Sequence, residues 1–428
     1  MKSQFHSTLT TLTNMSVTAS ASCTRLVGVA LLGATLVLAG CQSTGKSQVA
    51  VGPSVGPTAT KALGDTKKQY EYNSEIYLDV AIPIFNPGIP EDFDELKDKS
   101  IWPQLRRAEA NRFALMTKRA LENTKAFGNI SVVPSPQATA DLYVLGHIDE
   151  SNSEDVKITI ELVDITGRRW DKESFEHRVS EGFFRDKKTK VNDPYEPIFV
   201  DIADHIFNML TGKKEQEKNN IKQITDIRFA QSFSPETFSK HLSTDRKGYV
   251  TLNSLPSKND PMMSRIEPLR IQEQLFIDRL QTQYEGFAVK TDASYHKWQE
   301  NTLPAIVAAR EAENKTILAG LIGGAAIVLA AVNAKHDLSG VSQVATGAVA
   351  IAGAYMIKES FGSNDEAKVH RATIDEMGES LDLEVDPHVM TLEDKSVELT
   401  GTSQEQYIQW KAHLQRIYEL ENTPEKDL

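Results

Sequence analysis

Near the start of the chain, an apolar run determines which residues belong to the mature fold. Residues 26–38 are almost entirely apolar, Arg25 directly precedes them, and no acidic residue comes earlier. At about 1.5 Å per residue, this run as a helix is shorter than a hydrocarbon core of about 30 Å. Its size and its basic flank are typical of the core of a secretory signal peptide, which is removed and takes no part in the fold.

The apolar run leads into small residues and a thiol, namely Leu38, Ala39, Gly40 and Cys41. This tetrapeptide resembles the lipobox of bacterial lipoproteins. The resemblance implies that residues 1–40 are a signal peptide and that Cys41 becomes the first residue, carrying an N-acyl diglyceride. An uncleaved signal anchor with an ordinary cysteine is the alternative. The long stretch before Arg25 leaves open whether Met1 or Met15 starts the precursor.

The mature chain would be strongly acidic, with a single cysteine. Cleavage would remove Cys23, Lys2 and Arg25, which changes the formal net charge from −12 to −14 and leaves no pair of thiols for a disulfide. This excess of acid argues against a nucleic-acid partner and against electrostatic adhesion to anionic lipid. We therefore expect the lipid on Cys41 to supply the membrane attachment.

The residue after the cysteine bears on localisation. In enterobacterial lipoproteins, an Asp at this position retains the protein at the inner membrane, and here Gln42 occupies it. The resemblance therefore implies a lipid anchor in the outer membrane, with the chain facing the periplasm. Residues 41–72 are rich in Ser, Thr, Gly, Pro and Lys, which predicts a flexible tether because such a segment cannot bury enough apolar surface to fold alone.

Residues 73–212 carry the pattern of a small α/β domain. Apolar side chains alternate from Ile76 to Ile84, which predicts a strand, and a helix with an apolar stripe is expected to start near Pro103. Three further strands are expected at 130–133, 142–148 and 156–162, followed by a hairpin turn at 164–167 and a helix around 198–210. Such an order predicts a sheet packed by helices on one or both faces.

The stretches "ADLYVLGHID" and "ITIELVDITGRRW" show a family likeness in this domain. They resemble the α/β domain of the curli-export lipoprotein and the N-terminal domain of TolB, over about 75–210. The matching residues are Ala140, Asp141, Val144, Gly146, Ile148, Asp164, Gly167 and Trp170. The likeness implies structural roles for these residues, and it implies assembly into a periplasmic ring, as some relatives form.

The next two regions are expected to be a linker and a helical region that associates with other helices. Residues 213–260 are predicted as a linker with a short helix, and residues 261–364 as helical, with helices at 262–284 and 295–315. Residues 317–357 then form two apolar stretches around a polar loop, which predicts a helical hairpin. Small residues spaced four apart, or adjacent to such a pair, would let a second helix approach closely. They are Gly320, Gly323, Gly324, Thr346, Ala350 and Ala354.

Two interpretations of the 317–357 hairpin remain open. In the first, it enters the outer membrane, since the stretch 317–332 spans about 24 Å as a helix and the apolar band of outer-membrane proteins is about 25 Å tall. In the second, it is buried in a helical bundle or against copies of itself. Both interpretations predict helix association between subunits. Residues 365–428 are predicted as a small soluble β-α element, with Tyr407, Trp410, Leu414 and Ile417 on one helix face.

No arrangement of residues typical of catalysis is found in the sequence. His-Glu-x-x-His, Gly-x-Ser-x-Gly and a cysteine nucleophile are all missing, so we expect neither an enzyme nor a metal site. His147 and His177 fall on separate expected strands and are interpreted as solvated or core residues. The acidic run 153–155 lacks the spacing of a calcium loop and is expected on a solvated face. Apart from the lipid, no cofactor is expected.

Together these patterns predict an α+β protein: an N-terminal α/β sheet domain, a helical middle with a glycine-rich apolar hairpin, and a small C-terminal β-α element. The leading functional hypothesis is a structural subunit of an oligomeric envelope assembly of the secretion, surface-export or flagellar-base type. Its partners would be the membrane, copies of itself and other envelope proteins. A monomeric tethered module that binds a protein or cell-wall partner is the alternative, and an enzyme with an unrecognised site is the third.

Overall fold

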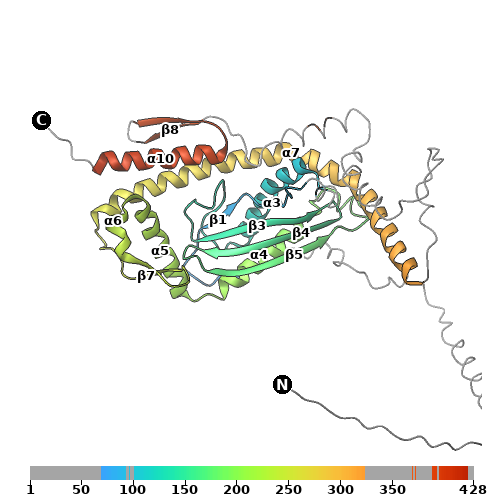
Figure 1. The fold of residues 1–428 in the computed structure, drawn as a ribbon, viewed down its shortest axis with the longest axis horizontal. Coiled ribbons are helices and arrows are strands. Elements are labelled where there is room, and N and C mark those ends of the chain that lie inside the picture. The colour runs from blue at the N-terminus through green and yellow to red at the C-terminus, as the bar shows by residue number, and fades with distance from the viewer. Residues whose placement is uncertain are drawn as a thin grey trace, which may run out of the picture. The chain divides into compact units, whose positions relative to one another are not determined.

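The computed structural model describes residues 69–92, 96, 101–322, 369, 372, 388–392 and 395–422. The fold class is α+β, as expected: a five-stranded mixed sheet with helices, a long helix, and a small C-terminal strand pair with a helix (Figure 1). All the described residues belong to one unit of the chain within Gly56–Leu428. Residues 1–68 and 323–368 lie outside the described residues, and with them the lipobox and most of the apolar hairpin.

The central sheet has the strand order β2-β1-β3-β4-β5. Its strands are β1 (Val80–Pro83), β2 (Ile130–Val133), β3 (Leu142–Ser151), β4 (Asp155–Asp164) and β5 (Arg169–Arg178). Strand β1 runs parallel to both of its neighbours, whereas β3, β4 and β5 form an antiparallel meander. The strands expected at 130–133, 142–148 and 156–162 and the hairpin turn at 164–167 are confirmed, whereas the strand expected from Ile76 to Ile84 is shorter and spans only Val80–Pro83.

Two helices cover one face of this sheet. Helix α3 (Pro103–Thr124) packs against β1, β2 and β3, and α4 (Glu196–Thr211) packs against β4, β5 and α3. Each helix has a proline in its first turn, where the missing backbone N–H costs no hydrogen bond. The alternating residues of β4 that face the helices are at most 3% exposed; they are Val156, Ile158, Ile160 and Leu162.

Helix α3 is buried on more than the one stripe that its sequence suggests. Arg106, Glu109 and Lys118 are each at most 7% exposed, although they are charged. The reason is that α7 (Pro261–Ile322) covers the part of α3 that faces away from the sheet. Charged residues on α3 are therefore internal to the structure and need partners from other elements.

Gly146 marks a close approach between β3 and the residue that follows β1. A Cβ atom at this position would lie 2.5 Å from the ring of Phe85, which is 1% exposed. The Phe85 backbone lies against α3, since its amide donates to the carbonyl of Ala110 at 3.3 Å. Only glycine leaves room for the ring here, which gives Gly146 the structural role that its sequence pattern suggested.

Residues 213–260, expected as a linker with a short helix, contain several packed elements. They are α5 (Glu215–Phe233), α6 (Pro235–Phe238), the 3-10 helix η2 (Ser239–His241) and the strand pair β6 (Leu242–Thr244) and β7 (Val250–Leu252). Helix α5 has 19 residues and buries Ile221, Ile224 and Ile227. The charged first turn of α5 is only partly solvated, because Lys218 is 2% exposed and pairs with Glu215 at 2.6 Å.

Helix α7 is continuous over 62 residues. The expected break between two helices, at 285–294, is helical, because its only glycine, Gly286, is solvent-exposed and its other residues tolerate a helix. Pro268 and Pro304 lie inside α7, and Figure 1 shows the helix bending towards its orange C-terminal part, as an internal proline would cause. No helix in the described part of the chain is long and apolar enough to qualify as a membrane span.

The C-terminal elements are a strand pair and a helix, and the helix packs onto α7. They are β8 (His388–Leu392), β9 (Lys395–Leu399) and α10 (Ser403–Asn422). The predicted apolar face of α10 is confirmed, since Tyr407, Trp410, Leu414 and Ile417 are each at most 1% exposed. Trp410 donates its indole N–H to the carbonyl of Gln272 at 3.3 Å, so α7 and α10 share one core.

Candidate functional site

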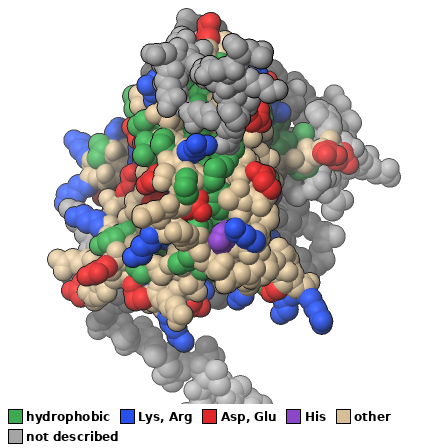
Figure 2. All heavy atoms as spheres, turned by 90° about the vertical axis from the view of Figure 1, so that its left-hand side faces the viewer, with side chains coloured by type: hydrophobic (Ala, Val, Ile, Leu, Met, Phe, Trp, Pro, Cys, Tyr) green, Lys and Arg blue, Asp and Glu red, His purple; other side chains and the backbone are tan. Residues whose placement is uncertain are grey.

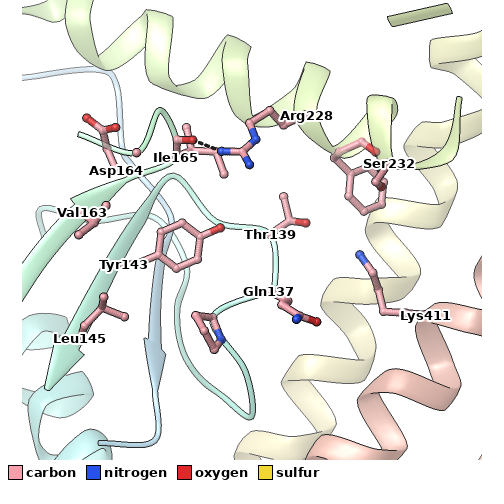
Figure 3. Close-up of a pocket in the computed structure, with 13 residues that line it drawn as sticks. Gln137, Thr139, Tyr143, Leu145, Val163, Asp164, Ile165, Arg228, Ser232 and Lys411 are labelled. Atoms are coloured by element: carbon pink, nitrogen blue, oxygen red, sulfur yellow. Dashed lines mark hydrogen bonds between the residues drawn. The ribbon is translucent and has the colours of Figure 1, made fainter. Parts of the chain in front are cut away.

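A pocket of about 460 Å³ lies on the sheet face that α3 and α4 leave open (Figure 3). Tyr143 and Leu145 of β3 and Val163 of β4 supply its floor, because residues that alternate with the buried ones point away from the helices. The loop after β2, helix α5 and helix α10 supply the walls. The wall residues are Pro136, Gln137, Thr139, Arg228, Phe229, Ser232 and Lys411.

The hydroxyl of Tyr143 holds the loop that forms one wall. It donates to the carbonyl of Ala138 at 2.9 Å and accepts from the amide of Ala140 at 3.2 Å. Burial raises the pKa of Tyr143, so the phenol stays neutral at any physiological pH. Tyr143 therefore shapes the pocket, and its hydroxyl has little capacity left for a ligand.

Two cations from different helices border the pocket. The guanidinium of Arg228 on α5 donates to the carbonyl of Ile165 in the β4–β5 turn, and the residue is solvent-exposed. The ammonium of Lys411 on α10 lies 3.0 Å from the carboxylate of Glu273 on α7. Among the described residues, no carboxylate lies within ion-pair distance of Arg228, so its charge is the less compensated of the two.

Asp164 borders the pocket, but its carboxylate is engaged elsewhere. It accepts from the backbone amide of Thr166 at 2.8 Å and from the indole N–H of Trp170 at 2.7 Å. Figure 3 shows the carboxylate turned away from the centre of the pocket. This turn, in which Gly167 has a φ of +85°, explains why Asp164, Gly167 and Trp170 occur together in the sequence pattern.

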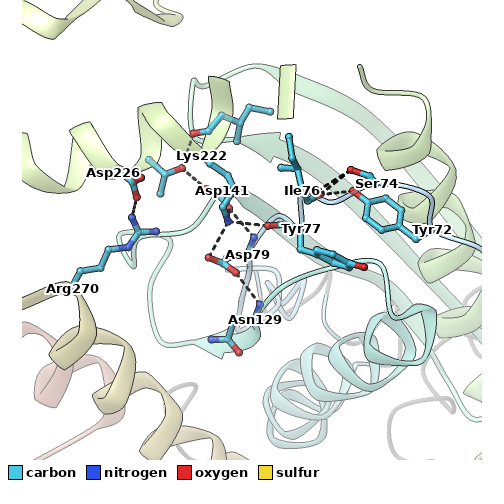
Figure 4. Close-up of polar contacts among 12 residues, drawn as sticks. Tyr72, Ser74, Ile76, Tyr77, Asp79, Asn129, Asp141, Lys222, Asp226 and Arg270 are labelled. Carbon is cyan, nitrogen blue, oxygen red and sulfur yellow. Dashed lines mark hydrogen bonds and ion pairs between the residues drawn. The ribbon is translucent and has the colours of Figure 1, made fainter. Parts of the chain in front are cut away.

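A second polar cluster joins β1, β3 and α5 (Figure 4). The carboxylate of Asp141 is 0% exposed and accepts from the amide of Asp79 at 2.8 Å, the hydroxyl of Thr225 at 2.6 Å and the ammonium of Lys222 at 3.1 Å. Lys222 also donates to the carbonyl of Tyr77 at 2.8 Å. Every bond in this cluster links elements of the fold, so Asp141 has a structural role.

The acidic run 153–155 differs from the expected solvated face. Ser153 and Glu154 are 0% and 2% exposed, and the Glu154 carboxylate accepts from the Arg310 guanidinium at 2.9 Å. Asp155 pairs with Arg178 across β4 and β5 at 2.6 Å. The expectation of a solvated face was wrong because Arg310 comes from α7, more than 150 positions later in the chain.

The two histidines singled out in the sequence are not brought together. His147 lies on β3 opposite Thr159 with a side chain 45% exposed, whereas His177 lies on β5 and is buried. Burial lowers the pKa of His177 to about 4, and the Pro194 backbone accepts its hydrogen bond. Among the described residues, three potential metal ligands do converge, Asp171, Glu173 and His205, with ligand atoms within 4.8 Å of one another.

Of the residues predicted to associate helices, the structure describes only Gly320, within α7. Gly323, Gly324, Thr346, Ala350 and Ala354 lie outside the described residues, as do Leu38, Ala39, Gly40 and Cys41. The pocket was missed by sequence reasoning, because its residues come from four separated segments. Asp171 and Glu173 carry one local signal, since residues two apart on a strand share a face.

The surface at the left-hand side of Figure 1 carries no single sign of charge. Figure 2 shows the molecule from the left-hand side of Figure 1, where hydrophobic side chains form an irregular band among acidic and basic ones. In comparisons with known proteins, neither a family model nor a curated protein matches the chain.

Proposed function

We propose that this protein is an outer-membrane-anchored lipoprotein that serves as a structural subunit of an oligomeric envelope assembly. In this proposal, the lipid on Cys41 holds the chain on the membrane, and contacts between glycine-rich helices join subunits. The observation that carries the proposal is the continuity of α7, which runs from the packed core into the apolar, small-residue segment and includes Gly320.

The first half of α7 is anchored in the core by polar contacts as well as by packing. The side-chain amide of Gln281 accepts from the amide of Val132 at 2.9 Å and donates to its carbonyl at 2.7 Å, which satisfies both groups on the edge strand β2. Asp292 pairs with Arg112 of α3 at 2.6 Å. A helix held in this way transmits the position of its far end to the sheet domain.

The length of α7 suits a connection between two layers of an assembly. A helix of 62 residues is about 93 Å long at about 1.5 Å per residue. The small residues at its far end would allow close helix–helix contact between subunits. Both interpretations of segment 317–357, inserted or buried, are compatible with this role.

The molar mass of the mature chain in mild detergent tests the proposal. We expect an oligomer by light scattering, and Gly320→Leu combined with Gly323→Leu and Gly324→Leu should reduce its mass towards that of a monomer. Gly286→Leu is the matched control, since Gly286 lies on α7 and a Cβ atom added there would meet no atom within 4 Å. A monodisperse monomer at high concentration would overturn the proposal.

The anchor is tested separately by localisation. Cys41→Ala, expressed behind a cleavable secretory leader, should leave the outer-membrane pellet and appear in the periplasmic fraction if the lipid is the whole attachment. Continued pelleting after a high-salt wash would instead indicate that segment 317–357 inserts. Wild-type protein without a lipid on Cys41, detected by mass spectrometry, would contradict the anchor.

One observation favours the alternative of a tethered binding module. The pocket on the open sheet face is bordered by Arg228 and lies within the usual size range of ligand sites, roughly 300–1,000 Å³. A binding role requires only a single folded chain that presents the pocket, whereas the structural role requires several chains to assemble. The two roles are compatible within one chain.

A further inference from the structure

We propose that the pocket on the open sheet face binds the carboxylate of a short peptide segment, with an adjacent apolar side chain on the pocket floor. This inference rests on the pocket and not on assembly, so it goes beyond the structural role proposed above. The supporting observation is that Arg228, whose guanidinium donates to one backbone carbonyl, borders the same pocket as the apolar strand residues Leu145 and Val163.

The charge at the pocket favours an anion. The whole chain has a net charge of −12, yet Arg228 and Lys411, which border this pocket from two helices, are both cations. The nearby carboxylates are already engaged, Asp164 with Thr166 and Trp170, and Glu273 with Lys411 and Tyr407. Arg228 has one carbonyl acceptor and retains donors for a second partner.

The neutral groups in the walls favour a peptide. Gln137 and Thr139 present an amide and a hydroxyl, and Figure 3 shows both side chains beside the pocket. No hydrogen bond from either side chain is found within the described part of the chain. Such groups pair well with the amides of a peptide backbone, and a guanidinium can bind a carboxylate through two parallel hydrogen bonds.

The position of the pocket on α5 disfavours a phosphate group. Arg228 and Ser232 lie in the last two turns of α5, which ends at Phe233. The carbonyl groups at the end of a helix carry partial negative charge, which opposes a doubly charged phosphate more strongly than a singly charged carboxylate. Phosphate sites instead use the amide groups at helix N-termini.

The shape of the pocket disfavours a long acyl chain. The cavity of about 460 Å³ opens to solvent, and its polar wall residues are interspersed with the apolar ones. An acyl chain gains affinity by burying its methylene groups from water along its length. A short apolar side chain next to a carboxylate fits this floor better.

The test uses the mature full-length chain in mild detergent and ligand-observed NMR titration. The probe is acetyl-Ala-Leu-Glu-amide, which carries one carboxylate, and its matched control is the neutral acetyl-Ala-Leu-Gln-amide. We expect the acidic peptide to bind roughly tenfold more tightly than the amide, the effect of one charge-assisted hydrogen-bonded pair. Equal binding of the two peptides, or no binding of either, would overturn the proposal.

Variants of the chain locate the site. Arg228→Gln should weaken binding of the acidic peptide roughly tenfold, whereas Arg246→Gln, the same change of charge in the exposed β6–β7 turn, should leave it unchanged. Ser232→Trp provides a second test, because Ser232 is exposed and a bulky ring there would block the pocket without changing charge. Unaltered binding by both pocket variants would place the peptide elsewhere and overturn the assignment.

Two further probes distinguish the ligand class. Inorganic phosphate and decanoate are titrated under the same conditions, and neither should compete with acetyl-Ala-Leu-Glu-amide at millimolar concentration. If phosphate or decanoate displaced the peptide at a concentration below the one at which the peptide itself binds, the assignment to a peptide would be rejected. Because the readout is ligand binding and not molar mass, a failure here leaves the assembly proposal standing, and a monomeric protein can still bind the peptide.

Discussion

The hydroxyl of Tyr295 on α7 donates a hydrogen bond of 2.8 Å to the carboxylate of Glu109 on α3. Both residues are buried, at 3% and 0% exposure. Ser151 donates a second hydrogen bond to this carboxylate at 2.5 Å, and Arg106 lies 3.3 Å from its other oxygen. A shifted α7 would leave a buried carboxylate without one donor, so this bond helps to select the position of the helix.

Tyr295→Phe removes that donor and keeps the ring. We expect a loss of about 1–3 kcal/mol in the free energy of unfolding, because the buried carboxyl group of Glu109 loses a hydrogen-bond partner. Urea unfolding of the mature chain, followed by tryptophan fluorescence, measures it. The matched control is Tyr284→Phe, whose buried hydroxyl donates to the neutral Ser403 at 2.9 Å and should cost only about 1 kcal/mol. A larger loss in the control would contradict the role of Glu109.

Glu109 should make wild type lose stability as the pH rises. Burial raises the pKa of Glu109 above its ordinary value of 4.5, so the folded state binds this proton more tightly than the unfolded state. Stability from this group is therefore complete below about pH 4.5 and falls as the pH rises towards the folded pKa. Relative to Glu109→Gln, the wild type should lose unfolding free energy between pH 4.5 and 7. A difference that stays constant with pH would contradict the raised pKa.

His177 should act in the opposite direction. Its pKa falls from 6.5 to about 4 on folding because burial disfavours the imidazolium. The neutral form stabilises the fold above about pH 6.5, and that stability is lost as the pH falls towards 4. Relative to His177→Gln, the wild type should lose about 2 kcal/mol between pH 7.5 and 5. Urea unfolding at several pH values measures this, and parallel curves for the two proteins would refute the prediction.

Gly146→Ala should destabilise the sheet domain by about 1–3 kcal/mol, as overpacking does, because the new methyl group would meet the Phe85 ring. Phe85→Leu in the same chain should restore part of the loss, since the smaller side chain gives way. Gly286→Ala is the contrasting control on α7, where no atom lies within 4 Å and alanine should stabilise the helix by up to about 1 kcal/mol. Thermal unfolding compares the three variants, and equal effects at the two glycines would exclude the close approach.

The periodicity of apolar residues was sufficient to predict elements that pack on one side only. The strand at 130–133 was predicted with the bounds that the structure shows for β2. The buried face of α10 was also predicted from its spacing, because a helix that packs on one side needs an apolar stripe every three to four residues. These features depend on periodicity, which a sequence displays directly.

Other features depended on partners far away in the chain. The sequence around Glu154 predicts a solvated carboxylate, but in the structure Glu154 pairs with Arg310. Lys218 lies in a charged run, yet it is buried under contacts that include Tyr72. Helix α5 was underestimated as part of a linker, since its apolar residues give it little amphipathic character. For Glu154 and Lys218, the sequence shows the charge but not the partner that compensates it.

By itself, the sequence determined the α+β class, the strand and helix periods, and the prediction of a lipid on Cys41, which is based on four consecutive residues. The tertiary structure alone decided that α7 is one helix held through Glu109 and Gln281, and that Tyr143, Arg228 and Lys411 border one pocket. The physical reason is that periodicity and signal motifs are local, whereas the burial of a charge and the walls of a pocket depend on segments brought together by folding.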